Sequence, residues 1–292
     1  MVGHAIAEIL VSEEDKKLDK IIDLLEFMKP YIEWTHNYTL GQLRLQKISL
    51  LEPKNVITFY YQGTAPVSFY IPRASVDHIQ THYLMNETFW DQETVEVLAP
   101  FVAGKHILDI GANVGNHSVF WGKLAGAASI QAFEPITETY DILERNVSLN
   151  NLGKIVKTHR IALGAESGSG DPVSIPSNRM QATVHSRKDG GGAIQIRTLD
   201  SYKFRNVHFA KIDVEGHTFA MLQGGLDTFN RCAPALYIEL FPHEFEKCRE
   251  LLTSNAYDVM GTIEDHNYVF VHRSKGQDAE QLRGMIKQAY HA

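Results

Sequence analysis

The chain is constrained most by a glycine-rich turn that joins an expected strand to an expected helix. Residues 107–110 suit a buried strand and carry a carboxylate at Asp109, and a helix is expected over Asn116–Lys123. The turn between them, residues 111–115, lets a ligand lie against bare backbone close to the N-terminus of the helix. Such a turn is typical of an α/β fold that binds its ligand at one edge of the sheet.

The residues of this turn indicate which kind of ligand it holds. The spacing D-x-G-x-N-x-G and the acid inside the strand do not fit the G-x-G-x-x-G of nicotinamide dinucleotide sites. They fit the turn that holds the amino-acid end of S-adenosylmethionine, a ligand with an ammonium and a sulfonium that needs acceptors. The alternative is an ordinary strand–glycine–helix turn without a ligand. The candidate ligand contacts at this turn are Asp109, Gly111, Ala112, Asn113, Gly115 and Asn116.

Composition indicates a globular protein from a reducing compartment. The 292 residues suffice for one large domain or for a domain with an appendage, and 44% of them are hydrophobic. No apolar run reaches the length that spans a bilayer, and the N-terminus lacks the basic region of a secretory signal. Cys232 and Cys248 indicate neither a zinc site nor a disulfide scaffold, so we expect a cytoplasmic protein. The net charge of −7 disfavours a nucleic-acid partner.

Three regions are expected along the chain: an N-terminal cap over residues 1–90, a main domain over 91–275 and a C-terminal helix within 276–292. In the cap, a helix with one apolar face should begin near Glu13 and stop at Pro30. The cap is expected to contact the acceptor or another subunit. It should also contain a hairpin of two β-prone runs, Val56–Tyr61 and residues 67–71.

From residue 105 onward, strand-like and helix-like segments alternate. This alternation predicts an α/β fold with a mostly parallel sheet covered by helices on both faces. Between residues 164 and 192 glycine, serine and proline recur, so this segment is expected to be a lid, a substrate-binding hairpin or a surface excursion. The expected strands are 129–134, 154–163, 207–214 and 236–240, the expected helices are 137–150, 217–223 and 244–254, and a last hairpin pairs 257–263 with 267–272.

A second acid is expected beside the ligand. Glu134 ends the strand after Asp109, close to the offset of roughly 20 residues at which an acid meets a ribose diol in doubly wound nucleotide folds. A carboxylate there can accept hydrogen bonds from two vicinal hydroxyls; the alternative is a solvated acid at a strand end. The third strand ends at Ala162 and Leu163, and its loop is expected beside the purine.

Further acids are expected on the acceptor side of the same edge. In Lys211-Ile-Asp-Val-Glu-Gly216, Asp213 and Glu215 are two residues apart and share a face of extended backbone. Glu239 ends the next strand and should point into the same cleft. These acids could orient a hydroxyl, accept its proton, attract the sulfonium or hold a divalent cation. His217 is a further candidate proton acceptor, unless it is simply a solvent-facing residue at a helix start.

Together these residues resemble the FkbM family of S-adenosylmethionine-dependent methyltransferases over about residues 89–272. The resemblance implies the class I methyltransferase (Rossmann-like) fold, a seven-stranded, mostly parallel sheet whose last strand is antiparallel. It also implies O-methylation of hydroxyls on sugars or natural products. One position departs from the family, because Thr218 stands where an acid is usual. The resemblance is carried by Asp91-Gln-Glu-Thr94, Leu108-Asp-Ile-Gly-Ala-Asn-Val-Gly-Asn116, Phe133-Glu-Pro135, Ala162-Leu-Gly164, Thr198-Leu-Asp-Ser-Tyr202, Lys211-Ile-Asp-Val-Glu-Gly216 and Tyr237-Ile-Glu-Leu240.

We therefore expect an O-methyltransferase that uses S-adenosylmethionine, with a divalent cation as an open alternative. The expected partner is a small-molecule or glycan acceptor, and a homo-oligomer is left open. Two rival functions remain: an RNA ribose 2′-O-methyltransferase, which the acidic net charge disfavours, and a catalytically idle scaffold that binds S-adenosylmethionine. The expected acceptor-side catalytic residues are Asp213, Glu215, Glu239 and His217.

Overall fold

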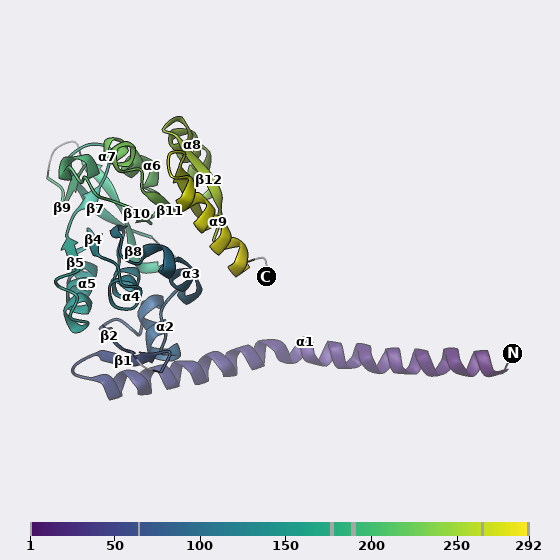
Figure 1. Cartoon of the computed structure of the whole chain (residues 1–292). Coiled ribbons are helices and arrows are strands. Elements are labelled where there is room, and N and C mark those ends of the chain that lie inside the picture. Colours follow the sequence, from purple (N-terminus) through teal and green to yellow (C-terminus); the bar gives the residue numbers. More distant parts are fainter. Residues whose placement is uncertain (1, 64, 176–177, 188–190, 264–265, 291–292) are drawn as a thin grey trace. The chain divides into compact units, whose positions relative to one another are not determined.

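The chain divides into two units, Met1–Glu52 and Pro53–Ala292, and each has its own architecture (Figure 1). The computed structural model describes residues 2–63, 65–175, 178–187, 191–263 and 266–290. None of the described helices is both long and apolar enough to cross a membrane.

The first unit is one long helix, α1, which spans Val2–Leu51 (Figure 1). Our prediction of a helix from Glu13 that stops at Pro30 was wrong at both ends. A proline removes one ladder hydrogen bond and crowds the preceding turn, at a cost of about 3 kcal/mol. Residues 31–51 contain no second proline and a single glycine, Gly41, so the helix continues beyond the proline.

The second unit begins with a hairpin and a short helix. β1 (Val56–Tyr61) and β2 (Ala65–Tyr70) pair antiparallel, which confirms the predicted hairpin. The helix α2 (His78–Asn86), which we did not predict, follows and stacks the ring of Tyr83 on that of Phe69 at 4.2 Å.

Side-chain hydrogen bonds connect the hairpin to a helix of the main sheet domain. The side chain of Asn150 accepts a hydrogen bond from Ser68 N and donates one to Ser68 O, and Asn146 Oδ1 accepts from Tyr70 N at 2.7 Å. We predicted a domain boundary near residue 90, whereas the structure includes the hairpin in the same unit as the sheet.

The centre of this unit is a seven-stranded sheet in the order β12-β13-β11-β10-β3-β4-β5. β3 pairs parallel with β4 and β10, and β13 runs antiparallel to both β11 and β12. The predicted fold class, including the antiparallel last strand, is confirmed. The strands are β3 (His106–Ile110), β4 (Ser129–Phe133), β5 (Val156–His159), β10 (Phe209–Ile212), β11 (Ala235–Glu239), β12 (Tyr257–Thr262) and β13 (Asn267–His272).

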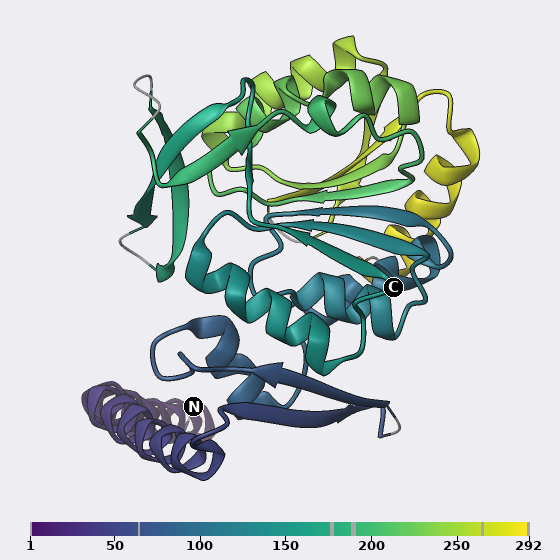
Figure 2. The same cartoon turned by 90° about the vertical axis from the view of Figure 1, so that its left-hand side faces the viewer.

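Helices cover both faces of this sheet (Figure 2). The chain moves outward from β3 through β4 to β5, then crosses to β10 on the other side of β3. The carboxyl ends of β3 and β10 therefore flank the point at which the strand order reverses, where α/β sheets bind their ligands. The helices are α3 (Gln92–Val102), α4 (Asn116–Lys123), α5 (Thr137–Leu149), α6 (Thr218–Gln223), α7 (Leu226–Cys232), α8 (Pro242–Ser254) and α9 (Gly276–Tyr290), with a 3₁₀ turn at Leu199–Tyr202.

A second, four-stranded sheet lies beside the main one, in the order β6-β9-β7-β8. We predicted one strand over residues 154–163, but the chain turns after His159, where Ile161 N donates to His159 O, and the second half joins the smaller sheet. The segment 164–192 contributes the hairpin of β7 and β8, and its functional role remains a prediction. The strands are β6 (Ala162–Leu163), β7 (Gly168–Ile175), β8 (Asn178–Arg187) and β9 (Ile194–Arg197).

Candidate active site

A cavity of about 310 Å³ opens at the carboxyl ends of the central strands. Its wall includes the turn after β3, the segments after β4 and β10, and the end of β11. Most of the predicted site residues lie on this wall. They are Gly111, Ala112, Asn113, Asn116, Glu134, Ala162, Leu163, Asp213, Glu215, His217 and Glu239.

The turn after β3 is held by backbone contacts that leave no space for a side chain at Gly111. Gly111 has φ +75°, and a Cβ placed on it would lie 1.7 Å from the carbonyl oxygen of Asp213. The amides of Gly111 and Ala112 both donate to Phe133 O, and Asn113, also at positive φ, accepts from the next amide through its own side chain. These contacts constrain the shape of the turn.

Glu134 lies on the cavity wall as predicted. Its carboxylate accepts hydrogen bonds from Asn113 N at 3.1 Å and from Ile136 N at 2.9 Å, one on each oxygen. Only 6% of the residue is exposed, and burial raises the pKa of this carboxyl to about 7 although both amides lower it. Each oxygen retains a second lone pair, so the carboxylate can still accept hydrogen bonds from a diol.

Asp109 does not lie on the cavity wall. It is fully buried behind it, where Ser118 Oγ donates to its Oδ2 at 2.6 Å and Lys211 Nζ lies 3.8 Å from its Oδ1. Gly115 is also absent from the wall, because its α-carbon faces Leu143. Our expectation that Asp109 and Glu134 both contact the ligand is therefore revised: Asp109 lies near Lys211, which in turn contacts Gly111 and Asp213.

Lys211 is a site residue to which the sequence argument gave no role. It is buried in β10, and its Nζ donates to Gly111 O at 2.7 Å and forms an ion pair with Asp213 Oδ2 at 3.1 Å. Lys211 thus connects the turn after β3 to Asp213, the acid that follows β10. A lysine in the middle of an otherwise apolar strand was the signal for it, since a charge is rarely buried without a partner.

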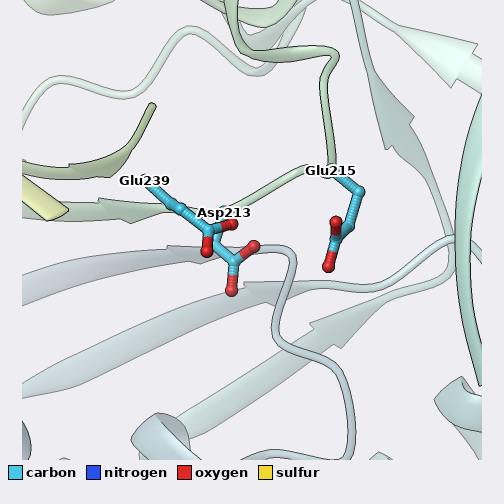
Figure 3. A group of neighbouring side chains, drawn as sticks. All are labelled: Asp213, Glu215 and Glu239. Carbon is cyan, nitrogen blue, oxygen red and sulfur yellow. The ribbon is translucent and has the colours of Figure 1, made fainter. Parts of the chain in front are cut away.

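Three acids meet at the wall of the cavity (Figure 3). Asp213, Glu215 and Glu239 each place a carboxylate oxygen within 4.8 Å of the other two. Asp213 follows β10 and Glu239 ends β11, and these strands are paired in parallel, so their ends meet. Glu215 belongs to the same cluster. Its own backbone has φ +45°, a conformation that costs a non-glycine residue energy.

The three acids differ in their affinity for a proton. Lys211 holds the pKa of Asp213 below its usual range even though burial raises it. Burial and the charge of Asp213 raise the pKa of Glu215 to about 7. Burial, the charge of Asp213 and a hydrogen bond to it raise the pKa of Glu239 to about 9. At neutral pH, Asp213 is therefore ionised, Glu239 is protonated, and Glu215 is close to its midpoint.

His78, His117 and His217 also line the cavity. His217 lies there as predicted, at the residue before α6. His117, which we did not predict, has a buried Nε2 with no hydrogen-bond partner among the described residues, and burial lowers its pKa to about 3. Its ring is therefore neutral and offers one nitrogen to a ligand.

Asn116 and Thr218 mainly support their neighbours. Asn116 Oδ1 accepts from Trp90 N and Tyr83 Oη, and its amide donates to Trp90 O, so it anchors the segment that brings Trp90 to the cavity. Thr218 is buried, and its hydroxyl donates to Glu239 O at 3.4 Å. At this position, where the resemblance led us to expect an acid, a neutral hydroxyl therefore contacts the backbone at the end of β11.

The lining suits S-adenosylmethionine better than a phosphate-bearing cofactor. Glu134 can take ribose hydroxyls, the apolar residues Ile161 and Leu163 can face a purine, and carboxylates stand where a sulfonium would be attracted. The buried cation at the turn, Lys211, is already compensated by Asp109 and Asp213, so it is not available for a pyrophosphate.

Comparison with known proteins agrees with this geometry. The model of the methyltransferase FkbM domain matches residues 109–270, and the chain belongs to this family. It is a methyltransferase. It is 25% identical over 185 residues to the methyltransferase sdnD of Sordaria araneosa, covering 51% of this chain and 71% of the relative. It is 22% identical over 208 residues to methyltransferase 1 of Beauveria bassiana, covering 62% and 82%.

Solved structures with a similar sheet include a methyltransferase FkbM from Methylobacillus flagellatus. It shares 15% identity at a TM-score of 0.45, and the match covers 66% of this chain and 52% of that one. A putative RNA methyltransferase from Pyrococcus horikoshii matches at 13% identity and a TM-score of 0.39, covering 62% and 80%.

Proposed function

We propose that this protein transfers the methyl group of S-adenosylmethionine to a hydroxyl of a sugar, glycan or natural-product small molecule. The observation that carries the proposal is the acid cluster of Asp213, Glu215 and Glu239 on the wall of the same cavity whose lining suits the methyl donor. A hydroxyl must lose its proton when it is methylated, and this cluster contains one carboxyl whose pKa is about 7.

The chain's first contribution is to position both partners. S-adenosylmethionine supplies a methyl group on a positively charged sulfur, which is a good leaving group. The turn of residues 111–115 and Glu134 would hold the donor from one side, and the acid cluster would hold the acceptor hydroxyl on the other. Alignment of this kind can contribute on the order of 7–11 kcal/mol.

The second contribution is to receive the hydroxyl proton. We assign this role to Glu215, because a base acts best when its pKa is close to the working pH. Asp213 stays ionised beside Lys211 and binds its proton too weakly. Glu239 already holds a proton, which it shares with Asp213, and His217 is retained as a candidate for passing the proton outward.

The same three carboxylates could instead hold a divalent cation, since hard cations prefer carboxylate oxygens. A bound cation would displace the proton of Glu239 and would itself lower the pKa of the acceptor hydroxyl. Removal of divalent ions with a chelator separates the two versions: full activity after chelation supports the proton-based arrangement, and loss that Mg²⁺ restores supports the metal.

The base assignment is tested by Glu215→Gln. We expect turnover to fall by roughly 10²–10⁴-fold, the usual contribution of a positioned base, while S-adenosylhomocysteine still binds. In the unsubstituted enzyme kcat/KM should rise with pH through about 7, as Glu215 loses its proton. The turnover of Asp213→Asn, which alters the neighbouring acid, is measured in the same way for comparison. If both variants kept full turnover while the donor bound, we would abandon the assignment.

The acceptor class is tested with methyl-labelled S-adenosylmethionine and fractionated cell extract. Label in the small-molecule or glycan fraction supports the proposal, and label in RNA would favour the ribose 2′-O-methyltransferase. A calorimetric titration with S-adenosylhomocysteine tests donor binding, and absent binding would remove the enzymatic proposal as a whole. Binding without transfer of label to any fraction would favour the scaffold alternative.

A further inference from the structure

A regular row of large apolar side chains runs along α1. Successive positions of the row are alternately three and four residues apart. One position, between Tyr38 and Leu45, holds Gly41 instead of a large side chain. This is the spacing of a coiled-coil seam, in which apolar residues repeat every 3.5 residues. Each member is between 56% and 83% exposed. We call this row the aromatic seam, and it consists of Leu24, Phe27, Tyr31, Trp34, Tyr38 and Leu45.

The aromatic seam offers about as much surface as a stable dimer requires. Trp34 stacks on Tyr31 at 6.3 Å and on Tyr38 at 5.5 Å, so the rings form one continuous ridge. Aromatic side chains can bury about 150–250 Å² each, so the four rings at their present exposure offer roughly 400–700 Å². Leu24 and Leu45 bring the total close to the roughly 800 Å² that each partner contributes to a stable interface.

From residue 18 onward, the charges of α1 are divided between two stretches, which we call its acidic half and its basic half. Residues 18–33 carry four acids, Asp19, Asp23, Glu26 and Glu33, and only two bases, Lys20 and Lys29. Residues 34–51 carry two bases, Arg44 and Lys47, and no acid. The charge therefore changes sign next to Trp34, which is also the middle of the aromatic seam.

We infer that α1 pairs with α1 of a second copy of this chain, antiparallel, through the aromatic seam. The pair is centred between Tyr31 and Trp34, so that each ring of the ridge meets a ring of the partner helix. The acidic half of each helix then lies along the basic half of the other, and Asp23 of one copy lies near Arg44 of the other. A parallel pair would place like charges together along both halves.

A second apolar row, Leu18, Ile21, Leu25, Met28 and Ile32, lies on another side of α1. It ends in the middle of the helix, because its next positions are Thr35 and Thr39. A symmetric antiparallel pair needs a seam that extends equally on both sides of the midpoint. The four rings of the aromatic seam lie symmetrically about the midpoint between Tyr31 and Trp34. The second row lies wholly within the acidic residues 18–33, so an antiparallel pair through it would place acids against acids.

The full chain tests this inference by its mass in solution. We expect a dimer of twice the 32.9 kDa chain mass at micromolar concentration in analytical ultracentrifugation. Trp34→Glu should weaken the dimer by roughly 30-fold or more, the loss expected when an aromatic anchor is removed. His36→Glu, which adds the same charge away from the seam, is the matched control and should leave the dimer intact. A monomeric parent chain, or a Trp34→Glu variant that dimerises as strongly as the parent, would overturn the inference.

Charge exchange tests the orientation. Asp23→Lys should weaken the dimer, and addition of Arg44→Glu in the same chain should restore it, because in an antiparallel pair the two positions meet across the interface. Failure of the double variant to recover would overturn the antiparallel arrangement. S-adenosylhomocysteine affinity, measured for every variant, should not change, which shows that the second unit remains folded.

Discussion

Two regions of the cavity wall surround their acids in opposite ways. In the first, to which we assign the methyl donor and which we call the donor end, Glu134 has a backbone amide on each carboxylate oxygen and lies beside a turn that is held by further backbone contacts. In the second, to which we assign the acceptor and which we call the acceptor end, Asp213, Glu215 and Glu239 crowd together, and Lys211 forms an ion pair with the first of them. In our proposal the donor end fixes positions, while the acceptor end holds protons that are easily moved.

The difference follows from what each end must do. Binding a constant donor needs a site that is complete before the ligand arrives, because preorganised groups lose little freedom on binding. Moving a proton needs groups whose pKa values differ, and crowding of like charges supplies such differences. The cost is a stored electrostatic repulsion and a strained backbone at Glu215.

The largest expected effect is at the donor end, with Gly111→Ala. The new Cβ would collide with the carbonyl oxygen of Asp213, and the residue would keep a positive φ. We expect a loss of about 3–5 kcal/mol in the free energy of unfolding, measured with denaturant. Gly126→Ala is the control, because Gly126 has φ +72° but open space around it and should lose only about 1–2 kcal/mol. Equal losses would show that the close approach to Asp213 is unimportant.

A smaller effect, on binding, is expected for Glu134→Ala. Removal of hydrogen bonds to a charged group typically costs about 1.5–3 kcal/mol, so S-adenosylhomocysteine should bind roughly 10- to 150-fold more weakly by calorimetry. Glu138→Ala removes an exposed acid that pairs with Arg73 outside the cavity, and its affinity should match the parent. If Glu134→Ala bound as tightly as this control, Glu134 would not be a donor contact.

The smallest effect is a gain in stability at the acceptor end, from Glu239→Gln. The pKa of Glu239 is raised from 4.5 to about 9 in the folded protein, so its contribution to stability is fully present below 4.5 and is lost as pH rises toward 9. A glutamine can donate the same hydrogen bond to Asp213 without this loss. We expect a gain of about 0.5–2 kcal/mol, larger at pH 8 than at pH 5 in thermal unfolding. An equal gain at both pH values would contradict the repulsion argument.

The glycine turn and the alternation of strands and helices could be predicted because they depend on local patterns. Three such features can be recognised from residues that are close together along the chain. They are glycines at positive φ, an acid at a strand end, and alternating strand and helix segments. The same reasoning located Glu134, Asp213, Glu215 and Glu239 on one edge, since parallel strands end together. The hairpin at residues 56–70 was predicted from its β-prone runs in the same way.

The errors arose where distant residues decide the outcome. Asp109 was expected to touch the ligand, but Ser118 and Lys211 hold it behind the wall, and the sequence does not reveal that Lys211 reaches back to Gly111. The predicted strand at residues 154–163 was divided because its second half pairs with β9, which lies more than thirty residues away along the chain. Pro30 was expected to end a helix that the residues after it continue.

The sequence by itself determined the class of fold, the family and the edge of the sheet at which the cavity lies, because these follow from sequence motifs, turn geometry and the periodicity of apolar residues. Only the tertiary structure decided which acid is ionised, which holds a proton and which is hidden. Those properties depend on burial and on the distance to one lysine, and neither is written in the spacing of residues along the chain.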